Sequence, residues 1–379
     1  MNDYSEKGLL PAGLADMLPP EAASEAAISD TLMRVFASNG YRRVKPPLIE
    51  FEEHLLEGSG AALASKMFRV MDPVSHRMMG LRTDITLQVA RIATTRLKQD
   101  PRPLRLSYSG QVLRVYGTQL RPERQFAQAG VELIGSSDIT ADAELILLVT
   151  EAMNALDITD YSIDLTVPNL VPTICNEMGI DAEVASTARE ALDHKDAAAL
   201  ADYEPEFSAI LMALLKASGP ADAALEALEA LSLPAKAAKQ IADLHRLVSQ
   251  LRAAAPELEL TIDPGEYRGF EYQTGLSFTV FGRKVRGELG RGGRYQLMDG
   301  ESASGFTLFL DSLMRAVPAK KFERTLYLPF GTPRKQGRSY RADGWHTVAG
   351  LAAEKDLKTE ALRLHCSHML GLDGLQKLS

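Results

Sequence analysis

The chain has 379 residues, of which 45% are hydrophobic and 24% are charged. This composition is typical of globular proteins and excludes disordered, collagen-like and coiled-coil chains. Lys and Arg number 42 against 50 Asp and Glu, so the net charge is −8. An acidic balance argues against a general nucleic-acid binder. Because single cores stop growing at about 250–300 residues, we expect more than one domain.

The two cysteines, Cys175 and Cys366, are too few for a disulfide framework, which indicates a reducing compartment. The first twenty residues carry acidic side chains and three prolines, so they do not resemble a signal peptide. Apolar runs stay far below the ~18 residues that a membrane-spanning helix needs. We therefore expect a cytoplasmic protein without a membrane segment.

The first half of the chain alternates helical and strand patterns. Residues 21–39 have helical spacing that ends at Gly40. Residues 41–50 are predicted to form a strand and turn. Pro46 and Pro47 place that strand at a sheet edge or at a chain-to-chain contact, since proline cannot donate to a ladder. Further on, the pattern predicts a helix at 84–97, a hairpin at 103–135 with a polar loop at 117–125, a helix at 140–156 and a strand at 161–167.

The second half contains a segment of different composition. Residues 181–256 are rich in alanine and hold a single glycine, which predicts a helical insertion, bounded at about 175–256. Strands are predicted at 258–262, 272–281 and 306–310. We expect a core domain at 1–318 and a short C-terminal α/β domain at 319–379.

Residues 126–134 are the most informative segment. As a strand, they place Ala127, Ala129 and two further apolar side chains on one face, while Gln128 and Glu132 lie on the other face, on either side of Gly130. A glycine within a strand often marks the close approach of a ligand or of another backbone. An amide and a carboxylate in this position can accept hydrogen bonds from a ligand ammonium or imidazole. The competing interpretation, favoured on this segment alone, is a solvated sheet face with a packing glycine.

Three arginine-containing segments are further candidates. Arg114 could clamp a carboxylate or phosphate, or could be a surface arginine that pairs with Glu123 or Glu132. Residues 267–275 would, if extended, place Arg268, Phe270, Tyr272 and Thr274 on one face, which suits a small polar metabolite. The glycine-rich residues 290–295 predict either an anion nest or a glycine hairpin.

Metal and nucleic-acid sites are weakly indicated. His365, Cys366 and His368 lack a second ligand pair, so a buried cysteine beside exposed histidines is favoured over zinc, and no metal or cofactor is expected. The basic stretch 320–346 has few interleaved aromatic residues. A solvated or subunit-contacting face is favoured there over RNA binding.

Taken in order, these segments resemble the catalytic core of a class II aminoacyl-tRNA synthetase of the histidyl type. Residues 40–49 resemble the dimer-forming first motif, and residues 81–86 resemble the amino-acid-binding loop. Residues 113–132 resemble the second motif with its following strand, and residues 268–275 with 292–295 resemble two signatures of histidyl enzymes. The resemblance implies an α+β fold with a mostly antiparallel sheet flanked by helices, the helical insertion and a reduced C-terminal α/β piece.

The departures from the synthetase pattern concern adenine. The second motif of the family has a glutamate that reads the adenine amino group, where this chain has Tyr116. The third motif ends in Gly-Leu-Glu-Arg, with the arginine on adenine, where this chain has Phe309-Leu-Asp-Ser312. Since a site built on hydrogen bonds is weakened strongly when its partners are missing, ATP binding is expected to be poor.

This chain keeps more of the family's amino-acid-binding residues than of its adenine-binding residues. The resemblance implies that histidine would be bound by eight residues: Asp84, Thr86, Arg114, Gln128, Glu132, Arg268, Tyr272 and Gln273. Asp84 or Glu132 would meet the ammonium, Arg114 the carboxylate, and Glu132 with Tyr272 the imidazole. Asp84 and Gln273 depart from the family, which has a glutamate and a tyrosine there.

A histidyl-type core without adenylation residues and without a full anticodon-binding domain resembles the regulatory subunits of ATP phosphoribosyltransferase. This resemblance implies a non-catalytic role in the first step of histidine biosynthesis. It also implies a dimer that assembles with a short-form catalytic subunit into a hetero-octamer, and L-histidine as an effector. The alternatives are a histidyl-tRNA synthetase or another amino-acid-binding paralogue of the synthetases.

Overall fold

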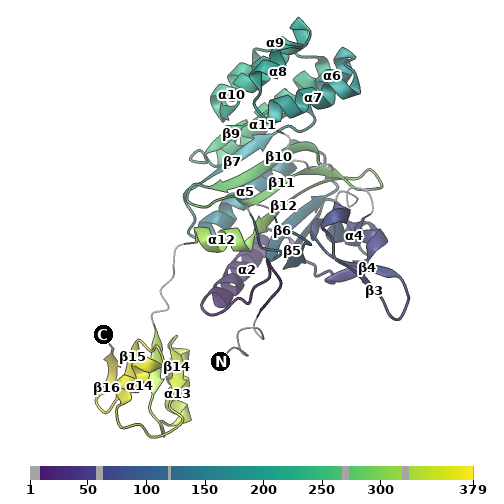
Figure 1. Ribbon diagram of the computed structural model, residues 1–379. Coiled ribbons are helices and arrows are strands. Elements are labelled where there is room, and N and C mark those ends of the chain that lie inside the picture. The colour runs from purple at the N-terminus through teal and green to yellow at the C-terminus, as the bar shows by residue number, and fades with distance from the viewer. Residues whose placement is uncertain (1–8, 57–62, 118–120, 267–272, 318–323, 379) are drawn as a thin grey trace. The chain divides into compact units, whose positions relative to one another are not determined.

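The computed structural model describes residues 9–56, 63–117, 121–266, 273–317 and 324–378, with only the backbone of residues 273 and 274. The chain divides into two compact units, Met1–Val317 and Pro318–Ser379 (Figure 1). The first unit contains the helical segment and nearly all of the candidate site residues, and the second is a small α/β unit.

A nine-stranded sheet organises the first unit. In spatial order its strands are β1 (Arg42–Arg43), β5 (Leu104–Leu113), β6 (Gln125–Ile134), β12 (Ser302–Phe309), β11 (Glu288–Gln296), β10 (Gln273–Gly282), β7 (Tyr161–Thr166), β9 (Leu260–Ile262) and β8 (Gly219–Pro220). The central pairs from β5 to β7 are antiparallel, whereas β1 with β5 and β7 with β9 are parallel. The mostly antiparallel α+β fold predicted from the sequence is confirmed.

The side chains of β6 alternate between the two faces of the sheet, as the sequence predicts. Ala127, Ala129, Val131 and Leu133 pack with the helices α2 (Glu21–Ser38) and α5 (Ile139–Ala155) in the large core. The opposite face carries Phe126 and Ile134, which pack with α4 (Thr86–Thr95) in a second, smaller core. Because β6 is buried on both faces, the interpretation of its polar face as solvated is wrong.

The segment with Pro46 and Pro47 lies at two sheet edges. β1 is the edge strand of the large sheet, and β2 (Ile49–Phe51) is the edge strand of a three-stranded sheet with β4 (Met78–Leu81) and β3 (Arg69–Met71). The short helix α3 (Glu52–Leu55) follows β2. The edge position predicted from the two prolines is confirmed, although the expected single strand is two.

The alanine-rich segment, together with residues 170–178 before it, forms helices. They are α6 (Leu170–Met178), α7 (Ala182–Asp193), α8 (Ala197–Ala201), α9 (Pro205–Lys216), α10 (Ala221–Glu229) and α11 (Ala235–Ala254). Their apolar faces join the large core through residues such as Leu192, Leu211 and Leu244. In Figure 1 they gather beside β7 and β9, away from the strands that carry the candidate site.

The second unit is a four-stranded sheet with two helices. The spatial order is β14 (His346–Ala349), β13 (Thr325–Leu328), β15 (His368–Gly371) and β16 (Gly374–Lys377), with α13 (Arg334–Ala342) and α14 (Leu357–Arg363) as connections. Tyr327, Ala361 and Cys366 form its small core. In the described residues of the whole chain, no helix is both long and apolar enough to cross a membrane.

The glycine-rich residues 290–295 are a central strand, so both the nest and the hairpin predicted for them are wrong. They belong to β11, which pairs with β10 and β12. A Cβ atom on Gly292 would lie 2.5 Å from the Gly305 carbonyl oxygen and from the Phe278 ring. The glycines therefore allow neighbouring strands and aromatic rings to approach, and they do not form a turn.

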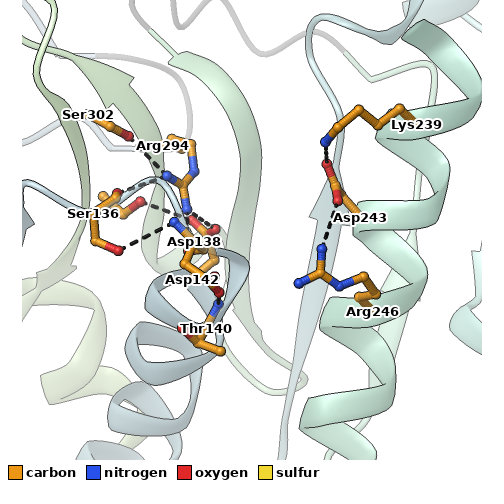
Figure 2. Close-up of polar contacts among 10 residues, drawn as sticks. Ser136, Asp138, Thr140, Asp142, Lys239, Asp243, Arg246, Arg294 and Ser302 are labelled. Carbon is orange, nitrogen blue, oxygen red and sulfur yellow. Dashed lines mark hydrogen bonds and ion pairs between the residues drawn. The ribbon is translucent and has the colours of Figure 1, made fainter. Parts of the chain in front are cut away.

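Arg294 on β11 joins the sheet to the start of α5 (Figure 2). Its guanidinium donates to the carbonyls of Ser136 at 3.0 Å and Asp138 at 2.8 Å and pairs with the Asp142 carboxylate. Asp142 is buried, and burial raises its pKa, while Arg294 and Ser304 act in the opposite direction. Arg294 therefore stabilises a carboxylate that would otherwise be costly to bury.

The two clusters in Figure 2 give a matched test of burial. We expect Arg294→Ala to lower the free energy of unfolding by about 3–5 kcal/mol, because it leaves a buried carboxylate without its cation. Arg246→Ala removes an exposed partner of Asp243 on α11 and should cost less than about 0.5 kcal/mol. Urea denaturation of both variants measures the difference, and similar costs would contradict it.

Candidate functional site

A small pocket opens on the α4 side of the large sheet, where β6, β11 and β12 run side by side. Its lining residues are Asp84, Thr86, Glu132, Arg291, Gly292, Gly293, Tyr295, Gly305, Phe306 and Thr307. The cavity volume is about 30 Å3, enough for about two water molecules. Three of the residues that the sequence singled out, Asp84, Thr86 and Glu132, therefore line one pocket.

Glu132 is the buried carboxylate of this pocket, with 1% of its surface exposed. Its Oε2 accepts a hydrogen bond of 2.8 Å from the Tyr295 hydroxyl, and its Oε1 accepts a longer one of 3.4 Å from Tyr108. Burial raises the pKa of Glu132 to about 8, although hydrogen bonds from Tyr295, Thr86 and Tyr108 favour the charged form. The pocket therefore holds a carboxyl group that a ligand cation would ionise.

Glycines make room for this carboxyl group. A Cβ atom on Gly305 would lie 1.9 Å from Oε2 of Glu132, so any larger residue there would displace the carboxylate. A Cβ atom on Gly130 would lie 2.3 Å from the Phe306 carbonyl oxygen and 2.5 Å from the Tyr108 hydroxyl. The close approach predicted at Gly130 exists, and it is to another strand and a side chain of the protein.

Asp84 and Gln128 form a polar pair beside Glu132. Oδ1 of Asp84 accepts the Thr86 backbone N–H at 2.8 Å, and Oδ2 accepts Nε2 of Gln128 at 3.2 Å. Gln128 is fully buried, and its Oε1 has no hydrogen-bond partner among the described residues. Because a buried acceptor without a donor is costly, this pair suits a ligand that brings N–H groups.

Arg114 follows β5 directly and lies next to the loop that carries Asp84. Its Nε and Nη2 donate to the Thr83 carbonyl at 3.4 and 3.5 Å, and its guanidinium lies 5.0 Å from the Phe126 ring centre. Burial lowers its pKa, and the charge of Arg291 adds to this effect. The surface pairing with Glu123 or Glu132 considered for Arg114 is wrong, since Arg114 turns to the Thr83 carbonyl.

Arg82 holds the same loop against two other segments. Its Nε donates to the Gln111 carbonyl at 2.7 Å and its Nη1 to the Pro46 carbonyl at 3.1 Å. A Cβ atom on Gly110 would lie 2.4 Å from this guanidinium. The side chains of Asp84 and Thr86 are therefore positioned by a loop that is fixed to β5 and to the edge segment.

The remaining predicted ligands lie at the limit of the described structure. Arg268 and Tyr272 are outside the described residues. Gln273 begins β10, and its backbone pairs with Tyr295, beside Glu132. Asp84, Thr86, Arg114, Gln128 and Glu132 are thus brought together from separate parts of the sequence.

The sequence interpretation missed Arg291, Thr307 and Tyr108. Arg291 belongs to the glycine-rich residues 290–295, for which the sequence predicts a nest or a hairpin and not a strand. Thr307 and Tyr108 share a hydrogen bond of 2.7 Å, and Tyr108 also contacts Thr86 at 3.2 Å. Gly305 on β12 and Leu106 on β5 lie opposite Glu132. Because side chains alternate along a strand, Thr307 and Tyr108, two residues further on, face the same side as Glu132.

No group of three or more His, Cys, Asp or Glu side chains placed to hold a metal ion occurs among the described residues.

The raised pKa of Glu132 predicts a pH-dependent difference between the wild type and Glu132→Gln. Between pH 4.5 and about 8, the folded protein keeps a proton on Glu132 that the unfolded chain loses, so Glu132 makes the wild type less stable as pH rises. Glu132→Gln cannot titrate, and we expect its stability relative to the wild type to rise by about 2–4 kcal/mol from pH 5 to pH 8.5.

Chemical denaturation at several pH values measures this difference. Glu144→Gln is the control with the opposite sign, because hydrogen bonding from Arg105 lowers the pKa of Glu144. The stability that Glu144 contributes is present above the ordinary glutamate pKa and is lost as pH falls. A difference for Glu132→Gln that does not vary with pH would contradict the raised pKa.

The comparisons with known proteins agree with this architecture. The histidyl-tRNA synthetase family model matches residues 13–313. The ATP phosphoribosyltransferase regulatory subunit of Paramagnetospirillum magneticum is 54% identical over 375 residues, which cover 99% of both chains. The protein of the same name from Rhodospirillum rubrum is 48% identical over 375 residues, which cover 97% of this chain and 96% of that one.

Solved structures show the same fold. An ATP phosphoribosyltransferase regulatory subunit/histidyl-tRNA synthetase from Bacillus halodurans has a TM-score of 0.80 at 25% identity, covering 93% of this chain and 96% of that one. A histidyl-tRNA synthetase from a Nostoc species has a TM-score of 0.80 at 19% identity, covering 96% of this chain and 92% of that one. The chain belongs to the ATP phosphoribosyltransferase regulatory subunit family, whose core has the histidyl-tRNA synthetase fold.

Proposed function

We propose that this chain is the non-catalytic subunit of a two-component ATP phosphoribosyltransferase in the cytoplasm, and that catalysis takes place in a short-form partner subunit. The observation that carries the proposal is the similarity, over nearly the whole length, to proteins named as regulatory subunits. In this role the chain raises the activity of the partner in the first step of histidine biosynthesis and transmits inhibition by histidine.

The region that would hold adenine in a synthetase supports a non-catalytic role. The Arg121 guanidinium lies 3.8 Å from the centre of the Phe309 ring, and it donates to Asp311 and to the Ser312 hydroxyl, both at 3.2 Å. Tyr116, at the position of the adenine-reading glutamate, is half exposed and donates to Ser65. The positions that contact adenine in the synthetase family are thus engaged with other side chains of this protein, which supports a non-catalytic role.

The pocket supports histidine as the effector. Glu132 with Tyr295 provides a buried acceptor and a hydroxyl for an imidazole, and Gln128 with Asp84 provides acceptors for an ammonium. Arg114 is the proposed carboxylate partner, and Arg268, Tyr272 and Gln273 complete the proposed site. For inhibition to reach a partner, histidine must favour one of two arrangements of the chain that the partner distinguishes.

The assembly follows from the same family resemblance. We infer a dimer formed through residues 40–49, which contain β1 and correspond to the first synthetase motif, and a hetero-octamer of four regulatory and four catalytic chains. The exposed edge of β1 is suited to a contact between chains, because its outer side has no strand partner among the described residues.

Reconstitution tests the proposal directly. We expect formation of phosphoribosyl-ATP by the short-form catalytic subunit to rise when this chain is added and to fall again with L-histidine. Allosteric coupling of the usual size would change activity by about 5- to 150-fold. Steady-state assays of the partner alone, of this chain alone and of the mixture measure the effect, and bovine serum albumin at equal concentration is the control.

Two results would contradict the proposal. The first is a mixture with no complex in size-exclusion chromatography and no change in activity. The second is histidine-dependent ATP–pyrophosphate exchange by this chain alone, which would instead indicate the alternative, a histidyl-tRNA synthetase or a related ligase.

Gln128 tests the effector pocket separately. We expect Gln128→Leu to weaken histidine binding about tenfold or more, because the ligand loses a buried acceptor. The stability of the ligand-free protein should change by less than about 1 kcal/mol, since the substitution also removes an unpaired buried oxygen. Gln111→Leu, on β5 and bonded to Glu25, is the matched control. Isothermal titration calorimetry that gives equal affinities for the two variants would contradict the assignment of Gln128.

A further inference from the structure

Arg291 is a pocket residue that neither the sequence motifs nor the family resemblance assigned. It lies on β11, where its Cα pairs with Thr307 on one side and Thr279 on the other. Its side chain lines the same pocket as Asp84 and Glu132 and is about a quarter exposed. It also lies 3.4 Å from the Glu288 carboxylate and 5.5 Å from the centre of the Phe309 ring.

Arg114, directly after β5, and Arg291, on β11, are far apart in the sequence, yet both lie close to Asp84: Arg291 lines the pocket with it, and Arg114 donates to the carbonyl of the preceding Thr83. After burial, the charge of Arg291 has the largest influence on the pKa of Arg114. Two guanidinium groups held close together repel each other, and an anion placed between them relieves that repulsion. Guanidinium groups bind carboxylates in a bidentate geometry that lysine cannot reproduce.

The pocket therefore brings both signs of charge together. Asp84 and Glu132 line it and attract cations, and Gln128 bonds to Asp84 beside it. Arg291 lines the same pocket and, together with the charge of Arg114, attracts an anion. A cavity with this polarity is complementary to a zwitterion, in which an ammonium and a carboxylate are separated by one carbon atom.

We propose that Arg291 acts together with Arg114 to hold the carboxylate of the amino acid bound in this pocket. This inference rests on the proposed function, because it takes an amino-acid effector as the ligand. Arg291 thereby determines specificity: it favours amino acids over amines and amino alcohols that carry the same side chain. A purely structural role, through Glu288 and Phe309, would affect all of these ligands alike.

L-Histidine and L-histidinol separate the two roles, because histidinol has a hydroxymethyl group in place of the carboxylate. We expect Arg291→Gln to weaken L-histidine binding about 10- to 100-fold, the usual effect of losing one hydrogen bond to a charged group. Histidinol binding should change less than about threefold. Arg291→Lys keeps the charge and should lie between Arg291→Gln and the wild type for L-histidine.

Isothermal titration calorimetry of the full-length chain measures these affinities, and thermal melting checks that each variant is folded. Arg283→Gln is the matched control, since Arg283 pairs with Asp160 and Glu259 at the start of the β10–β11 turn and does not line the pocket. Equal losses for histidine and histidinol in Arg291→Gln, or no loss for either, would overturn the inference and leave the effector assignment intact.

A different result would count against the proposed effector itself. If the wild type binds neither L-histidine nor histidinol, the pocket is not an amino-acid site, and both the effector and the role of Arg291 are refuted. If Arg291→Gln loses histidine binding selectively, while Arg283→Gln behaves like the wild type, the role of Arg291 is established.

Discussion

The burial of one carboxyl group, that of Glu132, constrains most of the architecture around the pocket. A buried carboxyl group needs hydrogen-bond donors, and these come from Tyr295 on β11, Tyr108 on β5 and Thr86 at the start of α4. It also needs space, which Gly305 on β12 provides. Four elements are therefore fixed in register around one side chain, and a shift of any strand by one residue would turn its contribution to the opposite face.

The sequence predicted the parts of the fold that depend on local patterns. The alternation along residues 126–134 separated the two faces of β6 correctly, although the polar face is buried and not solvated, and helical spacing identified α2 and α5. The sequence did not predict β11, because the glycines that allow close strand packing there are the same residues that form turns elsewhere. What distinguishes the two cases is the neighbouring strand, and a single sequence does not contain that information.

The candidate site also contains some residues that the sequence predicted and others that it did not. Asp84, Gln128 and Glu132 could be proposed because family motifs carry them, and the structure brings them within hydrogen-bonding distance or into one pocket. Arg291 and Arg121 could not be proposed, because each depends on tertiary contacts: Arg291 lies near Arg114, and Arg121 lies against Phe309 and Ser312. Phe309 and Ser312 indicated from the sequence alone that the third motif lacks its glycine and its adenine-binding arginine. The contacts that Arg121 makes with Phe309 and Ser312 came from the structure.

The contacts of Arg121 make the positions that depart from the synthetase motif depend on one another. An arginine in place of Ser312 would put a second guanidinium against Arg121, and a glycine in place of Phe309 would remove the aromatic ring closest to the Arg121 guanidinium. Removing Arg121 first would leave the buried Asp311 with Arg315 at 3.5 Å as its remaining ion-pair partner in the described structure. Positions 121, 309, 311 and 312 therefore depend on one another, and installing the synthetase residues in this chain would take several coordinated substitutions.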